Sequence, residues 1–184
     1  MELKEMITER LALRPITEAD WKNYVSHVIS DNEVYVQYGY EPEPSLIEYI
    51  QNPTPEVIYY SIILKDTDEM VGYIGITETN NNIEFYTFKE CRNNHYCSEA
   101  LNVFMEMYLN GEMTGTTHES IIGETIHENE ASIHLLEKAG FVKEAWGMRV
   151  NLSEDKVKDF DATGILRYEY TVGEENDKRR VLDS

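Results

Sequence analysis

Hydrophobic positions along the chain repeat with two different periods, and the period predicts the secondary structure of each segment. Apolar residues alternate with polar ones in RLALRPI (10–16), as in an edge strand. Three longer apolar runs follow, VIYYSIILK (57–65), MVGYIGIT (70–77) and IEFYTF (83–88), with the polar segments DTDE and NNN between them. Runs of this length joined by such short turns predict an antiparallel meander of strands.

Two segments in the first third of the chain carry the signature of a helix start. In TEADWKNYVSHVIS (17–30), Thr17 and Asp20 have the spacing of a capping box, in which each side chain accepts a hydrogen bond from the other residue's backbone N–H. SLIEYIQN (45–52) repeats this spacing with Ser45 and Glu48. We therefore predict a helix in each segment.

A longer helix is predicted in CRNNHYCSEALNVFMEMYL (91–109), which begins as a polar stretch without glycine or proline. From Ala100 onward the apolar residues recur at helical spacing, the pattern of a helix that buries one stripe. Ser98 and Glu99 precede this stripe, and we expect their side chains to satisfy free N–H groups at the helix start. Such a start is also suited to binding an anion.

The remaining segments complete an α/β pattern. A strand is predicted in SIIGETI (120–126), a helix in NEASIHLLEKAG (129–140), and strands in FVKEAW (141–146) and ILRYEYTV (165–172). This order predicts a mixed sheet with helices packed on it. We expect one domain over residues 1–172 and a polar, flexible tail over residues 173–184.

Composition narrows the classes of partner. The chain has 184 residues and a formal net charge of −19, from 35 acidic and 16 basic side chains. This charge disfavours nucleic acid and anionic membranes as partners and favours cationic ones. The two cysteines, Cys91 and Cys97, match neither a zinc pair nor a disulfide framework, and the histidine spacing matches no metal site. MELKEMITER has no signal-peptide centre and no apolar stretch reaches membrane-spanning length, so we predict a soluble, cytoplasmic protein without a metal.

Three motifs resemble the GNAT superfamily of acyl-CoA-dependent N-acyltransferases. They are RNNHYCSEAL after a strand, NEASIHLLEKAGF, and the opening TERLALRPITEADW, which is similar to the branch of ribosomal-protein N-terminal (alanine) acetyltransferases. The resemblance covers residues 8–172 or so. It implies a GNAT-like central mixed, mostly antiparallel twisted sheet with flanking helices, in which IEFYTF and SIIGETI form a splayed parallel strand pair.

The same resemblance implies a binding loop for coenzyme A. The family signature, Arg/Gln-x-x-Gly-x-Gly/Ala, uses backbone amides to hold the pyrophosphate at the start of the long helix. The loop residues that match or follow it here are Arg92, Asn93, Asn94, His95, Tyr96, Cys97 and Ser98. Because His95 and Cys97 replace the two glycine-type positions, we expect backbone strain or displacement in this loop.

Further coenzyme contacts follow from the resemblance. The pantetheine arm is expected along the backbone of Phe85 and Thr87, with the Asn129 side chain on its amides and Lys138 near the adenosine phosphates. For Asn129 the alternative is a plain N-cap, and both roles are compatible. For Lys138 the alternative is a solvated lysine matched to the helix dipole.

We assign the general base to Glu84, because a carboxylate in an apolar and aromatic strand is out of place unless it points into a cleft. Burial would raise its pKa toward a value suited to proton transfer. The alternative is that Glu84 faces solvent. Glu124 is a second candidate. The ribosomal-protein branch can use a carboxylate after the following strand as base, but Asn151 stands at that position here, and Glu154 substitutes only if the loop shifts.

We assign the general acid to Ser132. Many family members place a tyrosine at the position of Leu136, which carries no ionisable proton, whereas the ribosomal-protein branch has a serine at the position of Ser132. The alternative for Ser132 is a helix-start serine bonded to the backbone. If Ser132 is not the acid, Tyr168 or Tyr170 takes its place.

The acceptor pocket is expected between the first two helices. Tyr35, Tyr38 and Tyr40 are candidates for its wall, although packing against the sheet explains them equally well. Glu41 and Glu43 beside them suit a cationic amine.

The predicted function is transfer of an acetyl group from acetyl-CoA to a primary amine, either a protein N-terminus or a small amine, by direct attack in a ternary complex. A catalytically silent acyl-CoA-binding protein is the leading alternative, and a loop that binds another phosphate compound is a third reading. Monomer and homodimer both remain open.

Overall fold

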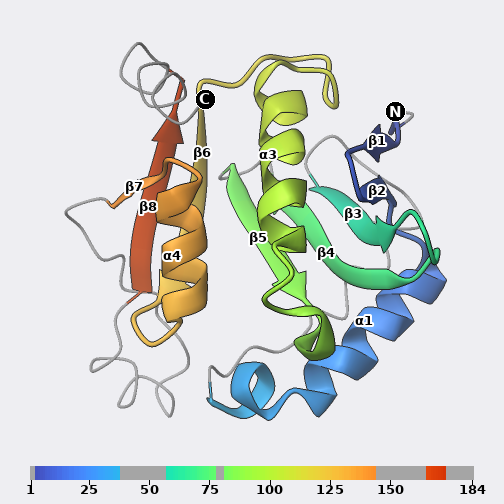
Figure 1. The fold of residues 1–184 in the computed structure, drawn as a ribbon. Coiled ribbons are helices and arrows are strands. Elements are labelled where there is room, and N and C mark those ends of the chain that lie inside the picture. The colour runs from blue at the N-terminus through green and yellow to red at the C-terminus, as the bar shows by residue number, and fades with distance from the viewer. Residues whose placement is uncertain (1–2, 38–56, 78–80, 144–164, 173–184) are drawn as a thin grey trace. The chain divides into compact units, whose positions relative to one another are not determined.

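The computed structural model describes residues 3–37, 57–77, 81–143 and 165–172. The chain divides into two compact units, residues 1–117 and residues 118–184, and each is described by itself (Figure 1). No helix among the described residues is long and apolar enough to cross a membrane.

The first unit contains five antiparallel strands that pair in chain order. They are β1 (Met6–Ile7), β2 (Leu11–Pro15), β3 (Val57–Leu64), β4 (Met70–Thr77) and β5 (Asn82–Thr87). The predicted meander is confirmed as β3, β4 and β5. No periodicity predicts β1, because two residues are too few to show a period.

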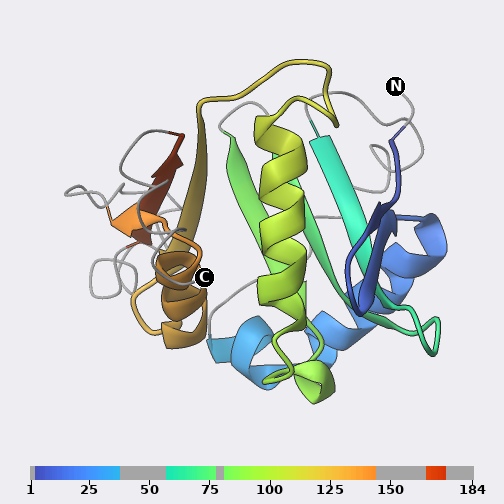
Figure 2. The same ribbon diagram turned by 45° about the horizontal axis from the view of Figure 1, so that its top comes forward.

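Two long helices cover opposite faces of this sheet, as Figures 1 and 2 show. They are α1 (Glu18–Ser30) and α3 (Tyr96–Leu109), and two short segments accompany them, the π-helical turn η1 (Glu33–Gln37) and the 3-10 turn η2 (Lys89–Cys91). Successive residues of β3 serve the two faces: Tyr59 joins the cluster under α1, whereas the Tyr60 ring lies 6.0 Å from the ring of Phe104 in α3. Burial on both sides explains why β3 reads as a continuous apolar run.

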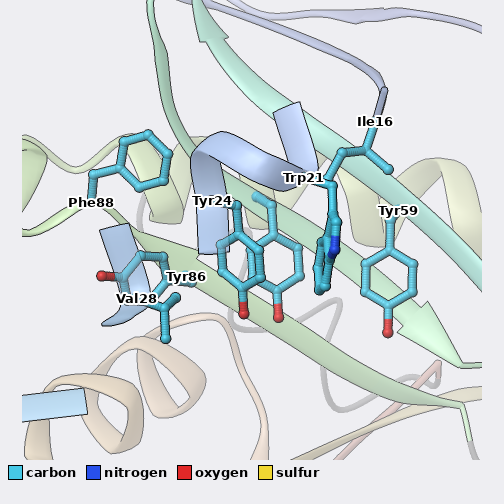
Figure 3. Packing of buried hydrophobic residues seen from close by; sticks show 8 residues of the cluster. Ile16, Trp21, Tyr24, Val28, Tyr59, Tyr86 and Phe88 are labelled. Atoms are coloured by element: carbon cyan, nitrogen blue, oxygen red, sulfur yellow. The ribbon is translucent and has the colours of Figure 1, made fainter. Parts of the chain in front are cut away.

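Aromatic rings fill the space between α1 and the sheet (Figure 3). The ring of Tyr24 lies 4.9 Å from that of Trp21, 4.4 Å from that of Tyr73 and 5.7 Å from that of Tyr86, measured between centroids. Rings at these distances add favourable edge and offset contacts to the area that they bury. The same cluster contains Tyr59, and Figure 3 shows the hydroxyl groups of Tyr24 and Tyr59 directed to the same side.

The predicted capping box at the start of α1 is confirmed. The Thr17 hydroxyl accepts a hydrogen bond from the Asp20 N–H at 3.2 Å, and an Asp20 oxygen accepts one from the Thr17 N–H at 2.9 Å. Arg14 donates to both Asp20 oxygens, at 2.6 and 2.9 Å. Burial alone would raise the pKa of Asp20, but the hydrogen bonds from Arg14 and Thr17 outweigh burial and lower it.

The start of α3 differs from the prediction. The helix begins at Tyr96, earlier than the apolar stripe suggests, and its N-cap is His95, with no side-chain cap. Neither Ser98 nor Glu99 caps the helix, because both already lie inside it and the Glu99 carboxylate accepts hydrogen bonds from Thr8 and Arg10 instead.

The second unit contains β6 (Ser120–Ile126), α4 (Glu130–Lys138), β7 (Val142–Lys143) and β8 (Ile165–Thr171). β8 pairs antiparallel with β6 and with β7. A Cβ on Gly123 of β6 would lie 2.7 Å from Cδ2 of Leu136, so the absence of a side chain there lets α4 lie close to the strand. The predicted α/β class, with mostly antiparallel strands and flanking helices, is confirmed. The predicted helix at 45–52 and the end of the predicted strand at 141–146 lie outside the described residues.

Replacing Thr17 by alanine is expected to lower the free energy of unfolding by about 1 kcal/mol, because the Asp20 N–H then loses its acceptor at the helix start. Urea denaturation followed by circular dichroism measures the change. Ser26→Ala is the matched control, since the exposed Ser26 hydroxyl only donates to the Asn23 carbonyl within the same helix. Equal losses in the two variants would contradict a specific role for the cap.

Candidate active site

Glu84 lies in a cross-strand row that a glycine keeps open. In the register of the sheet, Gly75 of β4 stands between Tyr59 of β3 and Glu84 of β5. A Cβ on Gly75 would lie 2.2 Å from Cδ1 of Tyr59 and 2.8 Å from the Ile58 carbonyl oxygen. The Tyr59 ring therefore crosses the strand over Gly75 and brings its hydroxyl to Glu84.

Two tyrosines donate hydrogen bonds to the Glu84 carboxylate. The donor–acceptor distances are 3.2 Å from the Tyr73 hydroxyl and 3.3 Å from the Tyr59 hydroxyl, both to Oε2. Burial raises the pKa of Glu84, and these two hydrogen bonds oppose the rise without cancelling it. The side chain is half-buried on the aromatic face of the sheet, on the same side as Tyr86.

The other candidate bases have different surroundings. Glu124 of β6 stands opposite Arg167 of β8 in the register, and its carboxylate lies 3.9 Å from the Arg167 guanidinium. Glu84, by contrast, is bound by two tyrosine hydroxyls, and burial raises its pKa, which is the environment better suited to a base. Asn151 and Glu154 lie outside the described residues.

The loop before α3 adopts the backbone that the glycine-type signature would favour. Asn93 and His95 have φ angles of 64° and 61°, in the left-handed region. His95 is the N-cap and occupies the first of the two altered glycine positions. The expected strain is therefore present there, at about 1 kcal/mol or more for a residue with a Cβ.

Free backbone donors gather where this loop becomes α3. The N–H groups of Tyr96, Cys97 and Ser98 lie in the first helical turn and have no acceptor among the residues that the structure describes. Cys97 has ordinary helical geometry, so the second altered position carries no left-handed strain. Burial raises the pKa of the Cys97 thiol to about 12, against the opposing effect of a hydrogen bond with Thr87. That bond ties α3 to β5 near the predicted pantetheine residues Phe85 and Thr87.

The Arg92 guanidinium is bound by acidic side chains rather than left open. It pairs with Asp31, which follows α1, and its Nη1 lies 3.1 Å from Oε2 of Glu33. Asp31 is 1% exposed and also accepts a hydrogen bond from the Tyr86 hydroxyl at 3.1 Å. Burial first, and then the Asp31 charge, raise the pKa of Tyr86. Sequence reasoning missed Asp31, whose only local signal is an acid directly after a helix.

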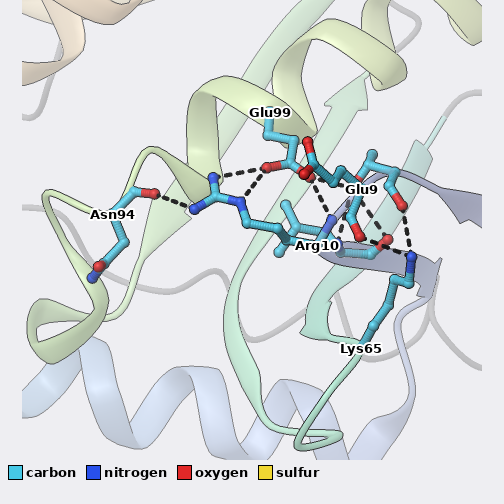
Figure 4. Close-up of polar contacts among 7 residues, drawn as sticks. Glu9, Arg10, Lys65, Asn94 and Glu99 are labelled. Carbon is cyan, nitrogen blue, oxygen red and sulfur yellow. Dashed lines mark hydrogen bonds and ion pairs between the residues drawn. The ribbon is translucent and has the colours of Figure 1, made fainter.

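A second arginine contacts the loop from the β1–β2 turn (Figure 4). Arg10 pairs with Glu99 of α3 at 2.7 Å and donates to the Asn94 carbonyl oxygen at 3.0 Å. Burial would raise the pKa of Glu99, but hydrogen bonds from Thr8 and Arg10 hold it below its ordinary value. No local pattern in the sequence indicates the role of Arg10, because its partners lie more than eighty residues away along the chain.

The second unit carries the remaining predicted residues on α4. Asn129 is the N-cap, and its Oδ1 accepts a hydrogen bond from the Ser132 N–H at 3.1 Å, so the capping alternative is realised. The Ser132 side chain is half-buried, and its hydroxyl makes no hydrogen bond to a residue that the structure describes. Lys138 is the last residue of the helix and is exposed.

Leu136, at the position where many family members have a tyrosine, is a core residue. It is 1% exposed and packs on Gly123. Tyr168 is one of the two alternative acids, and its hydroxyl donates to Glu137 at 3.3 Å. Burial and the Glu137 charge raise the pKa of Tyr168. The Tyr170 ring lies beside Gly140.

Most of the predicted acceptor wall lies outside the described residues, namely Tyr38, Tyr40, Glu41 and Glu43. Tyr35 is described: it lies in η1 and packs against the aromatic cluster under α1. Within the described ranges, no group of three or more His, Cys, Asp or Glu side chains could hold a metal ion.

Comparison with known proteins gives one family match by sequence. A family model described as an acetyltransferase (GNAT) domain matches residues 10–142. No curated protein sequence matches the chain.

Solved structures match over nearly the whole chain. An acetyltransferase from Agrobacterium tumefaciens has 19% identity and a TM-score of 0.69, covering 94% of this chain and 96% of its own. A ribosomal-protein-S5-alanine acetyltransferase from Vibrio fischeri has 13% identity and a TM-score of 0.68, with 91% and 96% covered. A spermidine N-acetyltransferase from Vibrio cholerae, in complex with CoA and spermine, has 13% identity and a TM-score of 0.67, with 89% and 96% covered. At these identities the likeness shows the fold, and it confirms the predicted fold class.

Replacing Glu84 by glutamine is expected to change how stability depends on pH. Because the folded-state pKa of Glu84 is raised, the folded protein keeps a proton that the unfolded chain has already lost. The free energy of unfolding of the wild type therefore falls as pH rises from the ordinary glutamate pKa through the raised one. Glu84→Gln removes this loss, so the variant gains stability relative to the wild type across that window.

Urea denaturation from pH 4 to pH 8 measures the difference. Glu106→Gln, which removes an exposed carboxylate on α3, serves as the control and is expected to follow the wild-type profile. A constant offset between Glu84→Gln and the wild type at every pH would show that Glu84 has an ordinary pKa in the folded protein.

Proposed function

The chain belongs to the GNAT acetyltransferase family, as the sequence motifs predicted, and from that premise we propose that it transfers the acetyl group of acetyl-CoA to a primary amine. The amine nitrogen attacks the thioester carbonyl carbon directly, a C–N bond forms, and the C–S bond breaks. The amine gives up a proton to a base, and the leaving thiolate takes one from an acid. This is a ternary-complex mechanism without a covalent enzyme intermediate.

The environment of Glu84 carries the proposal. An acceptor amine is protonated at neutral pH and must lose a proton before or during attack, so a carboxylate with a raised pKa is better matched to this transfer than an exposed one. The Tyr59 and Tyr73 hydroxyls hold the carboxylate in one orientation on an aromatic face. Such a face also stabilises an approaching cation through its rings.

The start of α3 supports acetyl-CoA as the donor. The free N–H groups of Tyr96, Cys97 and Ser98 and the positive end of the helix dipole are suited to the pyrophosphate. His95, in the left-handed conformation, makes the turn that glycine makes in the family signature. We assign the phosphate contacts to the backbone of residues 93–98, and the pantetheine contacts to the backbone of Phe85 and Thr87. Arg92 is also assigned to this site, where its guanidinium is paired with Asp31 and Glu33.

For the second unit, the proposed roles rest on the family resemblance. Ser132 is assigned as the acid that protonates the leaving thiolate, and its hydroxyl has no partner among the described residues that would occupy it. Asn129 caps α4 through its side-chain oxygen, and its amide nitrogen is assigned to the pantetheine. Lys138 is assigned to the adenosine phosphates.

The acceptor is a protein N-terminus or a small amine, and the charge of the chain favours a cationic one. The formal charge of −19 attracts cations over a long range. The two acceptor classes correspond to the ribosomal protein and spermidine named for the Vibrio enzymes of the same fold.

Acetyl-CoA is expected to stabilise the protein and to be consumed in the presence of an amine. At one hundred times its dissociation constant, a ligand adds about 2.7 kcal/mol, which raises Tm by about 5–10 °C for a domain of this size. Release of free thiol with a panel of polyamines and N-terminal peptides measures turnover. Binding without turnover across the panel would favour a silent acyl-CoA-binding protein, and stabilisation by ATP but not by coenzyme A would overturn the donor assignment.

Glu84→Gln and Ser132→Ala are each expected to lower kcat about a hundredfold or more, while the dissociation constant for acetyl-CoA changes little, because each removes a proton-transfer step. The acid limb of the kcat/KM profile, set by the raised pKa of Glu84, should disappear in Glu84→Gln. Steady-state kinetics at saturating substrates measures both. Glu106→Gln and Ser26→Ala are the matched controls. Near-normal kcat in Ser132→Ala would shift the acid assignment to Tyr168 or Tyr170.

A further inference from the structure

The start of α3 has an acidic side chain that would compete with a bound phosphate. Glu99 lies in the first turns of the helix, where a carboxylate is attracted to the free N–H groups. Left there, it would occupy the amides or repel a pyrophosphate. In the structure both of its oxygens are bound elsewhere.

Four donors from the β1–β2 turn hold the Glu99 carboxylate. Oε1 accepts from the Thr8 hydroxyl at 2.5 Å and from the Arg10 N–H at 3.0 Å. Oε2 accepts from Arg10 Nε at 2.8 Å and pairs with Nη2 at 2.7 Å. The charge of Glu99 is thus balanced by one guanidinium and directed away from the amides of the first turn.

The same guanidinium also holds the loop. Its Nη1 donates to the Asn94 carbonyl oxygen at 3.0 Å, between the two left-handed residues Asn93 and His95, and its Cζ lies 4.8 Å from the centre of the Tyr96 ring. In a trans peptide the C=O and the following N–H point in opposite directions. By binding the Asn94 carbonyl, Arg10 orients the His95 N–H away from itself.

The turn that carries Arg10 is also hydrogen-bonded to Lys65, as Figure 4 shows. Lys65, directly after β3, donates from Nζ to the carbonyl oxygens of Thr8 and Glu9, each at 2.9 Å, and its N–H donates to the Arg10 carbonyl at 3.0 Å. The position of the guanidinium is therefore set by the sheet and not only by the loop that it binds.

We propose that Arg10 is a positioning residue for the donor site: it neutralises Glu99 and fixes the Asn94–His95 peptide, so that the start of α3 accepts the pyrophosphate of coenzyme A. The proposal rests on acetyl-CoA being the donor. Arg10 acts through the loop and helix and requires no contact of its own with the ligand.

The test compares donors with and without phosphates. In Arg10→Met, the dissociation constant for coenzyme A, measured by calorimetry, should rise at least about tenfold, the size expected when a charged group loses its hydrogen-bond partner. The kcat at saturating acetyl-CoA should stay within about twofold. With S-acetylpantetheine, which has no phosphates, kcat/KM should be unchanged. A general structural defect would weaken both donors equally.

The double variant is expected to bind coenzyme A more tightly than Arg10→Met. Adding Glu99→Gln to Arg10→Met removes the unbalanced carboxylate and should recover part of the affinity for coenzyme A. The affinity that is still missing relative to Glu99→Gln alone is the contribution of the fixed Asn94–His95 peptide. Lys22→Met, which removes one exposed cation of α1, is the control for net charge and should change affinity less than about twofold.

Three results overturn the proposal. They are wild-type affinity in Arg10→Met, equal loss with both donors, and no recovery in the double variant. If Arg10→Met does not fold, Glu99→Gln is compared with the double variant, since neither has an unbalanced carboxylate, and equal affinities there would show that Arg10 does not fix the loop. Failure of the wild type to bind coenzyme A would instead refute the proposed function, on which this inference rests.

Discussion

Buried tyrosine hydroxyls need hydrogen-bond partners, and this constraint determines the polar features of the first unit. The face of the sheet under α1 is filled by the rings of Tyr59, Tyr73 and Tyr86. A polar group buried there without a hydrogen-bond partner would lower the stability of the fold. The tyrosine hydroxyls reach the edge of this aromatic layer and donate to carboxylates: two to Glu84 and one to Asp31. The Glu84 and Asp31 carboxylates thereby lie against the aromatic layer. Gly75 makes this arrangement possible, because any side chain there would displace the Tyr59 ring.

Near the loop before α3, each arginine is balanced by acidic side chains. Arg10 is bound to Glu99, and Arg92 is bound to Asp31 and Glu33. In a chain with a formal charge of −19, a cation is readily paired with acids of the same chain. Under the proposed function, the attraction of this loop for an anion then comes mainly from backbone N–H groups and the helix dipole. Such donors act only in one backbone geometry, so the conformation of Asn93 and His95 matters more than the charge of any one side chain.

In the second unit, Leu136 packs closely against β6. A tyrosine in place of Leu136 would need space that the contact with Gly123 does not offer, because that leucine already lies within van der Waals distance of the strand. The candidate acids on α4 and β8 are Ser132, Tyr168 and Tyr170. Of these, the Tyr168 hydroxyl is bound to Glu137. Leu136 therefore lies between helix and strand as a core residue, and the acid proposed on α4 is Ser132.

The sequence by itself determined the features that depend on neighbouring residues. The spacing of apolar residues predicted the strands and helices. The capping box of Thr17 and Asp20 and the N-cap at Asn129 were also predictable, because each joins groups three residues apart. The motifs were sufficient for the family and fold class, and the unusual Glu84 was visible as an acid in an aromatic strand. Only the tertiary structure decided the partners: Tyr59 and Tyr73 for Glu84, Asp31 for Arg92, and Arg10 for Glu99 and the Asn94 carbonyl. These contacts join residues 11 to 89 positions apart, and they form only once strand register and helix packing have brought the groups together. A periodic pattern records which face a residue occupies, but not which residue lies opposite, and that is the physical reason why the sequence predicted the elements and not the contacts between them.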